Sequence, residues 1–190
     1  MTDQSPVTRA VPTEVRELLV GRIRDVPDFP KPGVMFKDIT PLLADPRAFT
    51  ALTEVLAEIC RESGATKVVG LEARGFILAA PVAVRAHTGF VPVRKPGKLP
   101  GMTLAQSYDL EYGSTAIEMQ EGGLTPDDRV LVIDDVLATG GTAAAALQLV
   151  RRSGAAVAGV AVLLELDFLA GRERLLPELD GAPLEALLRV

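Results

Sequence analysis

Residues Arg129 to Thr142, with the sequence RVLVIDDVLATGGT, decide the fold that we expect for this chain. Val130 to Ile133 form a continuous apolar run, which is typical of a strand buried on both faces of a parallel sheet. Two acids, Asp134 and Asp135, follow at the carboxyl end of this run, and a loop of small or hydroxylated residues leads into an Ala-rich helix. That loop contains Ala138, Thr139, Gly140, Gly141 and Thr142. Because the backbone N–H groups of a glycine loop and of a helix N-terminus converge on anions, the stretch predicts a phosphate-binding unit.

The acid pair requires a separate reason, because carboxylates repel phosphate. A sugar that carries phosphate supplies one, since its 2- and 3-hydroxyls form a paired donor set that two carboxylates can accept from. We therefore predict a phosphorylated ribose as the ligand of this stretch. The alternative is an ordinary Gly-Gly turn after a buried strand, against which the acid pair and the flanking threonines argue.

This stretch resembles the PRPP-binding motif of the type I phosphoribosyltransferases, where PRPP is 5-phosphoribosyl 1-pyrophosphate. The resemblance implies an α/β fold with a central, mostly parallel sheet flanked by helices, an N-terminal hood over residues 27–43 and a flexible catalytic lid over residues 94–114. The length of 190 residues predicts one domain, which we place at residues 13–190 after a flexible tail of residues 1–12.

Composition narrows the class of protein. The net charge of -5 disfavours nucleic acid as a partner, so an anionic substrate has to be held by local positive groups. One cysteine, Cys60, rules out an intramolecular disulfide framework, and its helical pattern predicts buried packing. His87 is the single histidine, which leaves no histidine-based triad or metal cluster. No apolar run approaches the roughly 20 residues of a membrane span, and residues 1–12 do not resemble a secretory signal, so we expect a cytoplasmic protein.

Local patterns predict the elements around this stretch. Apolar residues at helical spacing predict a helix over Thr13 to Val26, with Thr13 as its cap. Asp45 and Pro46 stand at the N-cap and first positions of a second helix, which Gly64 ends. Further helices are expected over residues 75–86 and from Thr142 to about Arg152, strands at Lys67–Leu71, Phe90–Val93 and Ala156–Leu164, and a packed C-terminal segment at Pro183–Val190.

The segment Pro27 to Leu43 (PDFPKPGVMFKDITPLL) is rich in proline, which predicts no regular structure. Its apolar side chains suit either covering the core or lining a pocket. The segment closely resembles the N-terminal part of adenine phosphoribosyltransferases, where it forms part of a hood over the base. The resemblance implies adenine contacts at Met35, Phe36 and Lys37, with backbone groups at Met35 reading the purine edge. Many family members have arginine at the position of Lys37, and lysine lacks the planar guanidinium that stacks on a ring.

Glu72, Ala73, Arg74 and Gly75 follow the strand Lys67–Leu71 at its carboxyl end, the side on which α/β sheets bind ligands. Judged by residue type alone, Arg74 either binds a ligand phosphate or pairs with Glu72 at the surface. The resemblance implies that Arg74 contacts pyrophosphate, a role for which the fork of a guanidinium is suited.

Residues 94–113 (RKPGKLPGMTLAQSYDLEYG) have no sustained period, which within a compact domain indicates a functional lid or a disordered segment. Lys95 and Lys98 place positive charge near its start, either for pyrophosphate or as a solvated basic loop. SYDLEYG resembles the catalytic-loop motif of the family. That match implies catalysis by Glu111 and PRPP or AMP binding by Tyr112, whereas residue type alone would leave Glu111 facing solvent. Ser107–Glu111 and Thr115–Met119 are expected to pair as a hairpin.

Leu166 follows the strand Ala156–Leu164. The resemblance implies that its side chain packs on adenine, and core packing is the alternative. The chain contains no GxGxxG and no GxxxxGK[ST], so the signatures of dinucleotide-binding folds and P-loop NTPases are missing.

Taken together, the three motifs imply transfer of a 5-phosphoribosyl group from PRPP to adenine, which gives AMP and pyrophosphate in purine salvage. Mg²⁺ is the implied cofactor, held through PRPP and water rather than by a protein cage, and a homodimer is the implied assembly. Two alternatives stay open. One is a phosphoribosyltransferase for another base, and the other is a PRPP-sensing regulator without catalysis.

Overall fold

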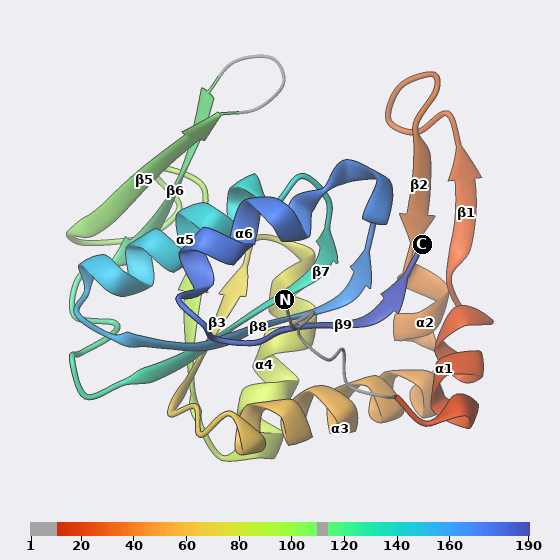
Figure 1. Ribbon diagram of the computed structural model, residues 1–190, viewed down its shortest axis with the longest axis horizontal. Coiled ribbons are helices and arrows are strands. Elements are labelled where there is room, and N and C mark those ends of the chain that lie inside the picture. Colours follow the sequence, from red (N-terminus) through yellow and green to blue (C-terminus); the bar gives the residue numbers. More distant parts are fainter. Residues whose placement is uncertain (1–10, 110–113) are drawn as a thin grey trace, which may run out of the picture.

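The computed structural model describes residues 11–109 and 114–190. Its centre is a five-stranded sheet in which every neighbouring pair of strands is parallel. The strand order is β4 (Gly89–Val93), β3 (Lys67–Leu71), β7 (Arg129–Leu137), β8 (Ala156–Glu165) and β9 (Leu184–Arg189). The predicted α/β class with a central parallel sheet is confirmed (Figure 1).

Helices cover both faces of this sheet (Figure 1). Successive residues of a strand alternate between the faces, so the two faces bury different residues. Val130 and Val132 of β7 join the core cluster under α5 (Gly141–Arg152) and α6 (Gly171–Leu179). Leu131 and Ile133 join the cluster on the other face, which is covered by α1 (Thr13–Val20), α3 (Pro46–Glu62) and α4 (Arg74–Ala86).

The prediction of the second helix is confirmed in detail. The side chain of Asp45 caps α3 by accepting hydrogen bonds from the backbone N of Arg47 at 2.9 Å and of Ala48 at 3.2 Å. Pro46 occupies the first turn, where no intrahelical N–H bond is required. Cys60 is a free, fully buried cysteine on this helix, as expected.

The predicted helix over Thr13 to Val26 is wrong in its second half. Helix α1 ends at Val20, and residues Arg24–Pro27 form strand β1. Pro12 stands at the N-cap position, and no side chain caps the helix, so Thr13 does not have the role expected of it. Tertiary pairing of β1 with another strand outweighs the helical spacing of the apolar residues.

The segment Pro27 to Leu43 contains regular structure, contrary to the prediction. Strand β2 (Met35–Asp38) pairs antiparallel with β1, and the short helix α2 (Thr40–Ala44) follows. The prolines avoid positions that must donate a hydrogen bond. Pro27 is the last residue of β1, and Pro41 lies in the first turn of α2.

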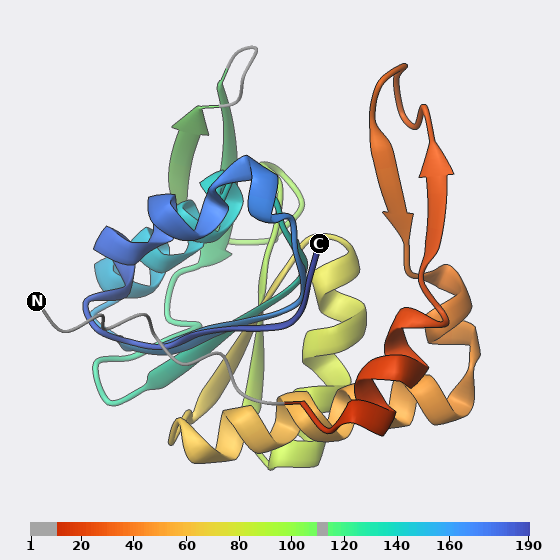
Figure 2. The ribbon, with the colours of Figure 1, turned by 45° about the vertical axis from the view of Figure 1, so that its right-hand side comes forward.

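A second hairpin is built from β5 (Thr103–Asp109) and β6 (Ser114–Gln120), which pair antiparallel along their whole lengths. The expected hairpin therefore exists and begins earlier than predicted. The connecting residues 110–113, which include Glu111 and Tyr112, lie outside the described residues, as does most of the predicted tail. Hairpins β1–β2 and β5–β6 project toward the same end of the molecule (Figures 1 and 2).

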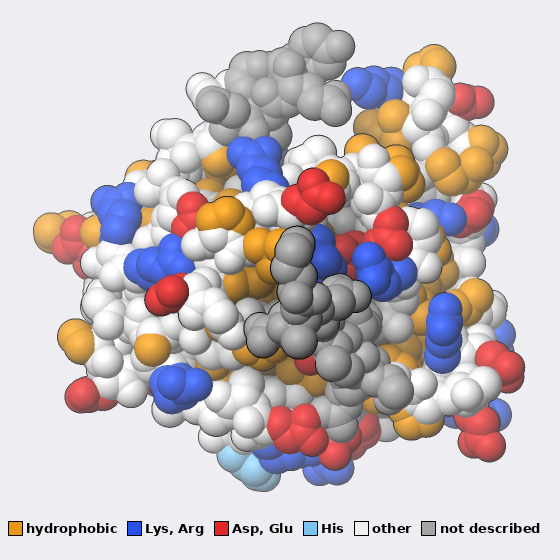
Figure 3. Space-filling model, in the orientation of Figure 1, with side chains coloured by type: hydrophobic (Ala, Val, Ile, Leu, Met, Phe, Trp, Pro, Cys, Tyr) orange, Lys and Arg blue, Asp and Glu red, His pale blue; other side chains and the backbone are white. Residues whose placement is uncertain are grey.

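The C-terminal segment packs as expected, because β9 is the edge strand beside β8 and buries Leu184, Ala186 and Leu188. Among the described residues, no helix combines the length and the apolar character needed to cross a bilayer. Acidic and basic side chains alternate over the face shown in Figure 3 without a broad patch of one sign.

Candidate active site

The acids of the decisive stretch lie within strand β7, not after it as predicted. Pairing with β3 stops at Ile133, which is opposite Gly70, whereas pairing with β8 continues from Asp134 to Leu137. Strand β7 thus extends beyond β3, because β8 is ten residues long and supplies ladder hydrogen bonds to the end. Asp134 and Asp135 therefore lie on the part of β7 that does not pair with β3. They are next to the start of α4, since a Cβ atom on Gly75 would lie 2.8 Å from Oδ1 of Asp134.

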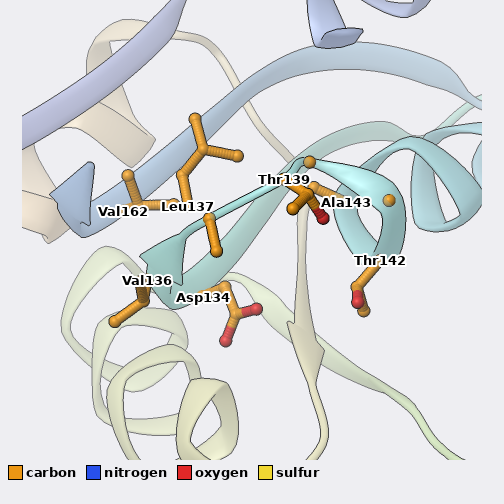
Figure 4. A pocket seen from close by; sticks show the side chains of 10 residues that line it. Asp134, Val136, Leu137, Thr139, Thr142, Ala143 and Val162 are labelled. Atoms are coloured by element: carbon orange, nitrogen blue, oxygen red, sulfur yellow. The ribbon is translucent and has the colours of Figure 1, made fainter. Parts of the chain in front are cut away.

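The loop after β7 has the shape that the sequence predicts. Gly140 adopts a left-handed conformation, with φ of 78°, and α5 begins at the next residue. No side chain caps this helix, so its first N–H groups are available to a ligand. A hollow with a volume of about 80 Å³ lies over the loop, lined by Asp134, Val136–Ala143 and Val162. Figure 4 shows the carboxylate of Asp134 and the hydroxyl of Thr142 on the same side of the loop.

Helix α6 packs closely against this loop, because there is a glycine on each side of the contact, Gly140 in the loop and Gly171 at the start of α6. A Cβ atom on Gly140 would lie 2.7 Å from the carbonyl oxygen of Gly171, and a Cβ on Gly171 would collide with the carbonyl oxygen of Ala138. Both contacts are backbone to backbone, so only glycine allows this approach at either position. The sequence reasoning assigned no role to Gly171. A glycine at the first position of a charged helix was the available signal, but it does not reveal the partner.

Burial raises the pKa values of both acids of the pair. Burial, followed by the charge of Asp135, raises the pKa of Asp134 well above its ordinary value. Burial also raises the pKa of Asp135, although the guanidinium of Arg74 opposes the rise. Oδ1 of Asp134 accepts a hydrogen bond from the backbone N of Asp135 at 2.9 Å. The pair therefore holds negative charge less readily than two solvated carboxylates, and it is suited to accept hydrogen bonds from ligand hydroxyls.

Arg74 is the first residue of α4 and pairs with Asp135, not with Glu72. Its Nε lies 2.9 Å from Oδ2 of Asp135, an oxygen that is buried and lacks a hydrogen bond of good geometry. Its guanidinium carbon also lies 5.0 Å from the centre of the Phe36 ring. Arg74 thus connects the acid pair of β7 to the hairpin β1–β2. The alternative pairing with Glu72 is wrong.

Glu72 instead organises the basic turn at residues 94–98. It forms an ion pair with Arg94 at 3.3 Å and accepts a hydrogen bond from the backbone N of Lys95 at 2.8 Å. The second of these contacts is the main cause of the lowered pKa of Glu72. Lys95 and Lys98 are exposed at this turn, beside the start of α4. The role of Arg94 in holding this turn in place is not evident from the sequence.

Three of the residues predicted to contact adenine lie on β2, and the fourth, Leu166, directly follows β8. Phe36 is half-buried and points toward Arg74, and its ring also meets Phe29 edge-on at 5.0 Å. Met35 and Lys37 lie on the other face of β2, because side chains alternate along a strand. Lys37 pairs with Asp25 at 2.8 Å. Leu166 follows β8 and donates its backbone N–H to the carbonyl of Leu137 at 2.9 Å, so it lies beside the end of β7.

The donor set suits a magnesium ion that arrives with a phosphorylated ligand. In the described part of the chain no three acidic, histidine or cysteine side chains cluster as a metal cage. Asp134 lines the hollow, and Asp135, whose Oδ2 is paired with Arg74, is its neighbour on β7. Mg²⁺ commonly binds through one or two carboxylates together with substrate phosphates and several waters. These residues fit such an ion as outer contacts.

Comparison with known proteins agrees with this geometry. The family model for the phosphoribosyl transferase domain matches residues 38–180 of this chain. The adenine phosphoribosyltransferase of Streptomyces coelicolor is 71% identical over 179 residues, which cover 94% of this chain and 98% of the relative. The solved adenine phosphoribosyltransferase of Rhodothermus marinus is 51% identical, with a TM-score of 0.87 and coverage of 93% of this chain and 99% of that chain.

A third relative was solved with ligands. The adenine phosphoribosyltransferase of Saccharomyces cerevisiae, complexed with D-2,5-dideoxy-2,5-imino-altritol 1,6-bisphosphate and adenine, is 37% identical with a TM-score of 0.85. The match covers 92% of this chain and 99% of that chain. The likeness therefore extends over nearly the full length of each protein.

Proposed function

This chain belongs to the adenine phosphoribosyltransferase family, and from that premise we propose how its residues perform the reaction. The enzyme transfers the 5-phosphoribosyl group of PRPP to adenine and forms AMP and pyrophosphate in purine salvage. The observation that carries the assignment of residues is the junction at Arg74. There the acid pair of β7 is connected to the aromatic hairpin β1–β2, with an ion pair to Asp135 at 2.9 Å and a ring contact to Phe36 at 5.0 Å.

The sugar-phosphate half of PRPP binds at the end of β7. The 5-phosphate accepts hydrogen bonds from backbone N–H groups of Ala138–Thr142 and from the hydroxyls of Thr139 and Thr142. Asp134 and Asp135 accept hydrogen bonds from the ribose hydroxyls. The raised pKa of each acid supports this role, because a buried carboxylate without enough donors gains most from a ligand that supplies them. Replacing both acids by asparagine should weaken PRPP binding in calorimetry, and unchanged affinity would contradict the assignment.

Adenine binds between the hairpin β1–β2 and the end of β8. Phe36 and Leu166 supply apolar contacts to the faces of the base, and backbone groups at Met35 read its polar edge. Phe36 is held for this role by Arg74 and Phe29. An adenine contact by Lys37 stays a prediction. The Lys37 side chain lies on the opposite face of β2 from Phe36 and pairs with Asp25, so we place it at the periphery of the adenine site.

Pyrophosphate leaves toward the positive charge at the start of α4. Arg74 offers its guanidinium there, and Lys95 and Lys98 add exposed charge from the turn that Glu72 holds. The acid pair of β7 would help to hold Mg²⁺ that binds with PRPP, and the ion would supply positive charge for the leaving group.

Glu111 takes the proton of the base. As the bond from ribose C1 to pyrophosphate breaks and the bond to the adenine nitrogen forms, that nitrogen must lose its proton. A carboxylate on the segment that joins β5 and β6 can accept it. By analogy with glycosyl transfer, the sugar carries oxocarbenium-like charge in the transition state. Tyr112, on the same segment, is assigned to PRPP or AMP binding.

We also propose that the enzyme is a cytoplasmic homodimer. The open edge of β4 and the adjoining surface of α4 offer an apolar face, since Ile77, Val84 and Phe90 are 43%, 77% and 36% exposed. Sedimentation should give the mass of two chains for the wild type and of one chain for Val84→Glu. A wild-type monomer would contradict the proposal.

The base specificity and the catalytic role are tested in one assay. Radiolabelled adenine, hypoxanthine, guanine, xanthine and orotate are each incubated with PRPP and Mg²⁺, and nucleotide formation is measured. Adenine alone should give nucleotide at a substantial rate. Preference for another base would overturn the adenine assignment. Tight PRPP binding without turnover of any base would instead favour a PRPP-sensing regulator.

A further inference from the structure

Tyr108 of strand β5 contacts the loop Ala138–Thr142, which is called the phosphate loop below. The hydroxyl of Thr142 donates to the hydroxyl oxygen of Tyr108 at 3.0 Å. The ring lies against the start of α5, since a Cβ atom on Gly141 would lie 3.1 Å from Cδ2 of Tyr108. The ring also packs on the core cluster under α5 and is half-buried. The tyrosine hydroxyl is therefore held in place by contacts of its ring, independently of its hydrogen bond.

Hydroxyl chemistry gives this contact a second arrangement. Each hydroxyl has one proton to donate and two lone pairs that accept, and the proton rotates to suit its surroundings. When Thr142 turns its proton toward an anion in the hollow, its oxygen becomes free to accept from Tyr108. The result is a chain of donors from Tyr108 through Thr142 to the anion, in which each bond polarises and strengthens the next.

We propose that Tyr108 is a positioning residue for the 5-phosphate, acting through Thr142. In the free enzyme Tyr108 accepts from Thr142 and fixes the rotamer of that side chain. In the complex Tyr108 donates to Thr142, so that Thr142 donates fully to phosphate. This inference rests on the proposed function, which puts the 5-phosphate in the hollow beside Thr142.

A second contact between hairpin β5–β6 and α5 provides a matched control. At the other end of α5, a guanidinium nitrogen of Arg152 donates to the side-chain oxygen of Gln106 at 3.2 Å and to the carbonyl of Ala105. Gln106→Ala removes the side-chain part of this contact between the hairpin and α5 and leaves residues 138–142 unchanged. A general tethering role of the hairpin would make this variant resemble Tyr108→Phe, whereas a role in the donor chain would not.

Calorimetry with AMP and with adenosine tests the proposal on the full chain. Tyr108→Phe should weaken AMP binding about fivefold, the size expected for one net hydrogen bond, and should leave adenosine binding unchanged because adenosine has no phosphate. Gln106→Ala should leave both affinities unchanged. Unchanged AMP affinity in Tyr108→Phe, or equal losses for AMP and adenosine, would overturn the inference.

A double-mutant cycle separates this inference from the proposed function. Thr142→Val should weaken AMP binding, and adding Tyr108→Phe to it should cause no further loss. Fully additive losses would show that Tyr108 does not act through Thr142. If Thr142→Val left AMP affinity unchanged, the proposed contact of Thr142 with the phosphate would fail together with the inference. A loss in Thr142→Val without one in Tyr108→Phe would remove the inference alone.

Discussion

The acid pair of β7 and the hairpin β1–β2 lie on the two sides of Arg74, yet different forces hold them in place. Strand β7 is flanked by β3 and β8, and its apolar residues Val130 to Ile133 are buried on both faces. The hairpin has only two strands and is largely exposed. It depends on the ring contact of Phe29 with Phe36 and on surface ion pairs such as Arg24 with Asp38 at 2.6 Å.

These differences suggest a division of roles. A two-stranded hairpin is marginally stable on its own, and exposed ion pairs contribute roughly 0 to 1 kcal/mol each. The loop after β7 is fixed by backbone contacts with α6 that tolerate no added atom. On the proposed assignment, the sugar-phosphate site is fixed by backbone contacts with α6, whereas the base contacts lie on a hairpin with fewer packing contacts. Substitutions in the two regions should affect different kinetic constants.

The largest effect is expected from Glu111→Ala, on the segment between β5 and β6. Loss of a general base should lower kcat by about 100-fold or more, while PRPP affinity stays unchanged because the phosphate loop is intact. Stopped assays of AMP formation and calorimetry with PRPP measure the two quantities. Glu121→Ala, at an exposed residue just after β6, is the control and should behave like the wild type. Near-normal turnover would remove Glu111 from the mechanism.

The next effect concerns the support behind the phosphate loop. In Gly171→Ala the new Cβ collides with the carbonyl of Ala138, so the loop must shift and PRPP affinity should fall by about 30-fold or more, as for loss of several hydrogen bonds. Gly181→Ala is the control, since Gly181 has φ of 83° but open space around it. The control should lose about 1 kcal/mol of stability at full affinity. Wild-type affinity in Gly171→Ala would show that the loop is not held by α6.

A smaller effect is expected in the hairpin. Phe36→Leu removes the ring that lies against Arg74 and should raise KM for adenine about tenfold, with KM for PRPP unchanged. Phe90→Leu on edge strand β4, whose ring contacts Phe76 at 5.9 Å, is the matched control and should change neither constant. Equal increases in both KM values for Phe36→Leu would mean that the two regions do not act separately.

The smallest effect is a dependence of stability on pH. The pKa of Asp134 is raised in the folded protein above its ordinary value of 3.8, so folding is favoured when the group is protonated and loses stability as pH rises through the folded pKa. Asp134→Asn removes that loss. Its Tm should match the wild type's near pH 4 and exceed it by a few degrees at pH 8. A Tm difference that is constant over this range would argue against a buried carboxyl with a raised pKa at Asp134.

Local chemistry was readable from the sequence where a few neighbouring residues suffice. Asp45 with Pro46 predicted the start of α3, and the Gly-Gly loop predicted where α5 begins. Predictions from the sequence are wrong where the partners are distant along the chain. The helix predicted to reach Val26 stops at Val20 because β1 pairs with β2, and β7 continues through its acids because β8 pairs with them.

The sequence by itself determined the alternation of buried strands and helices, the acid pair and the small-residue loop, because these depend on contacts between residues that are close along the chain. Only the tertiary structure decided which residues meet across the site. Arg74 with Asp135, Gly140 with Gly171 and Tyr108 with Thr142 are each brought together from different elements. Their meeting depends on strand register and helix packing, which arise from the burial of the whole core and leave no mark in any single stretch of sequence.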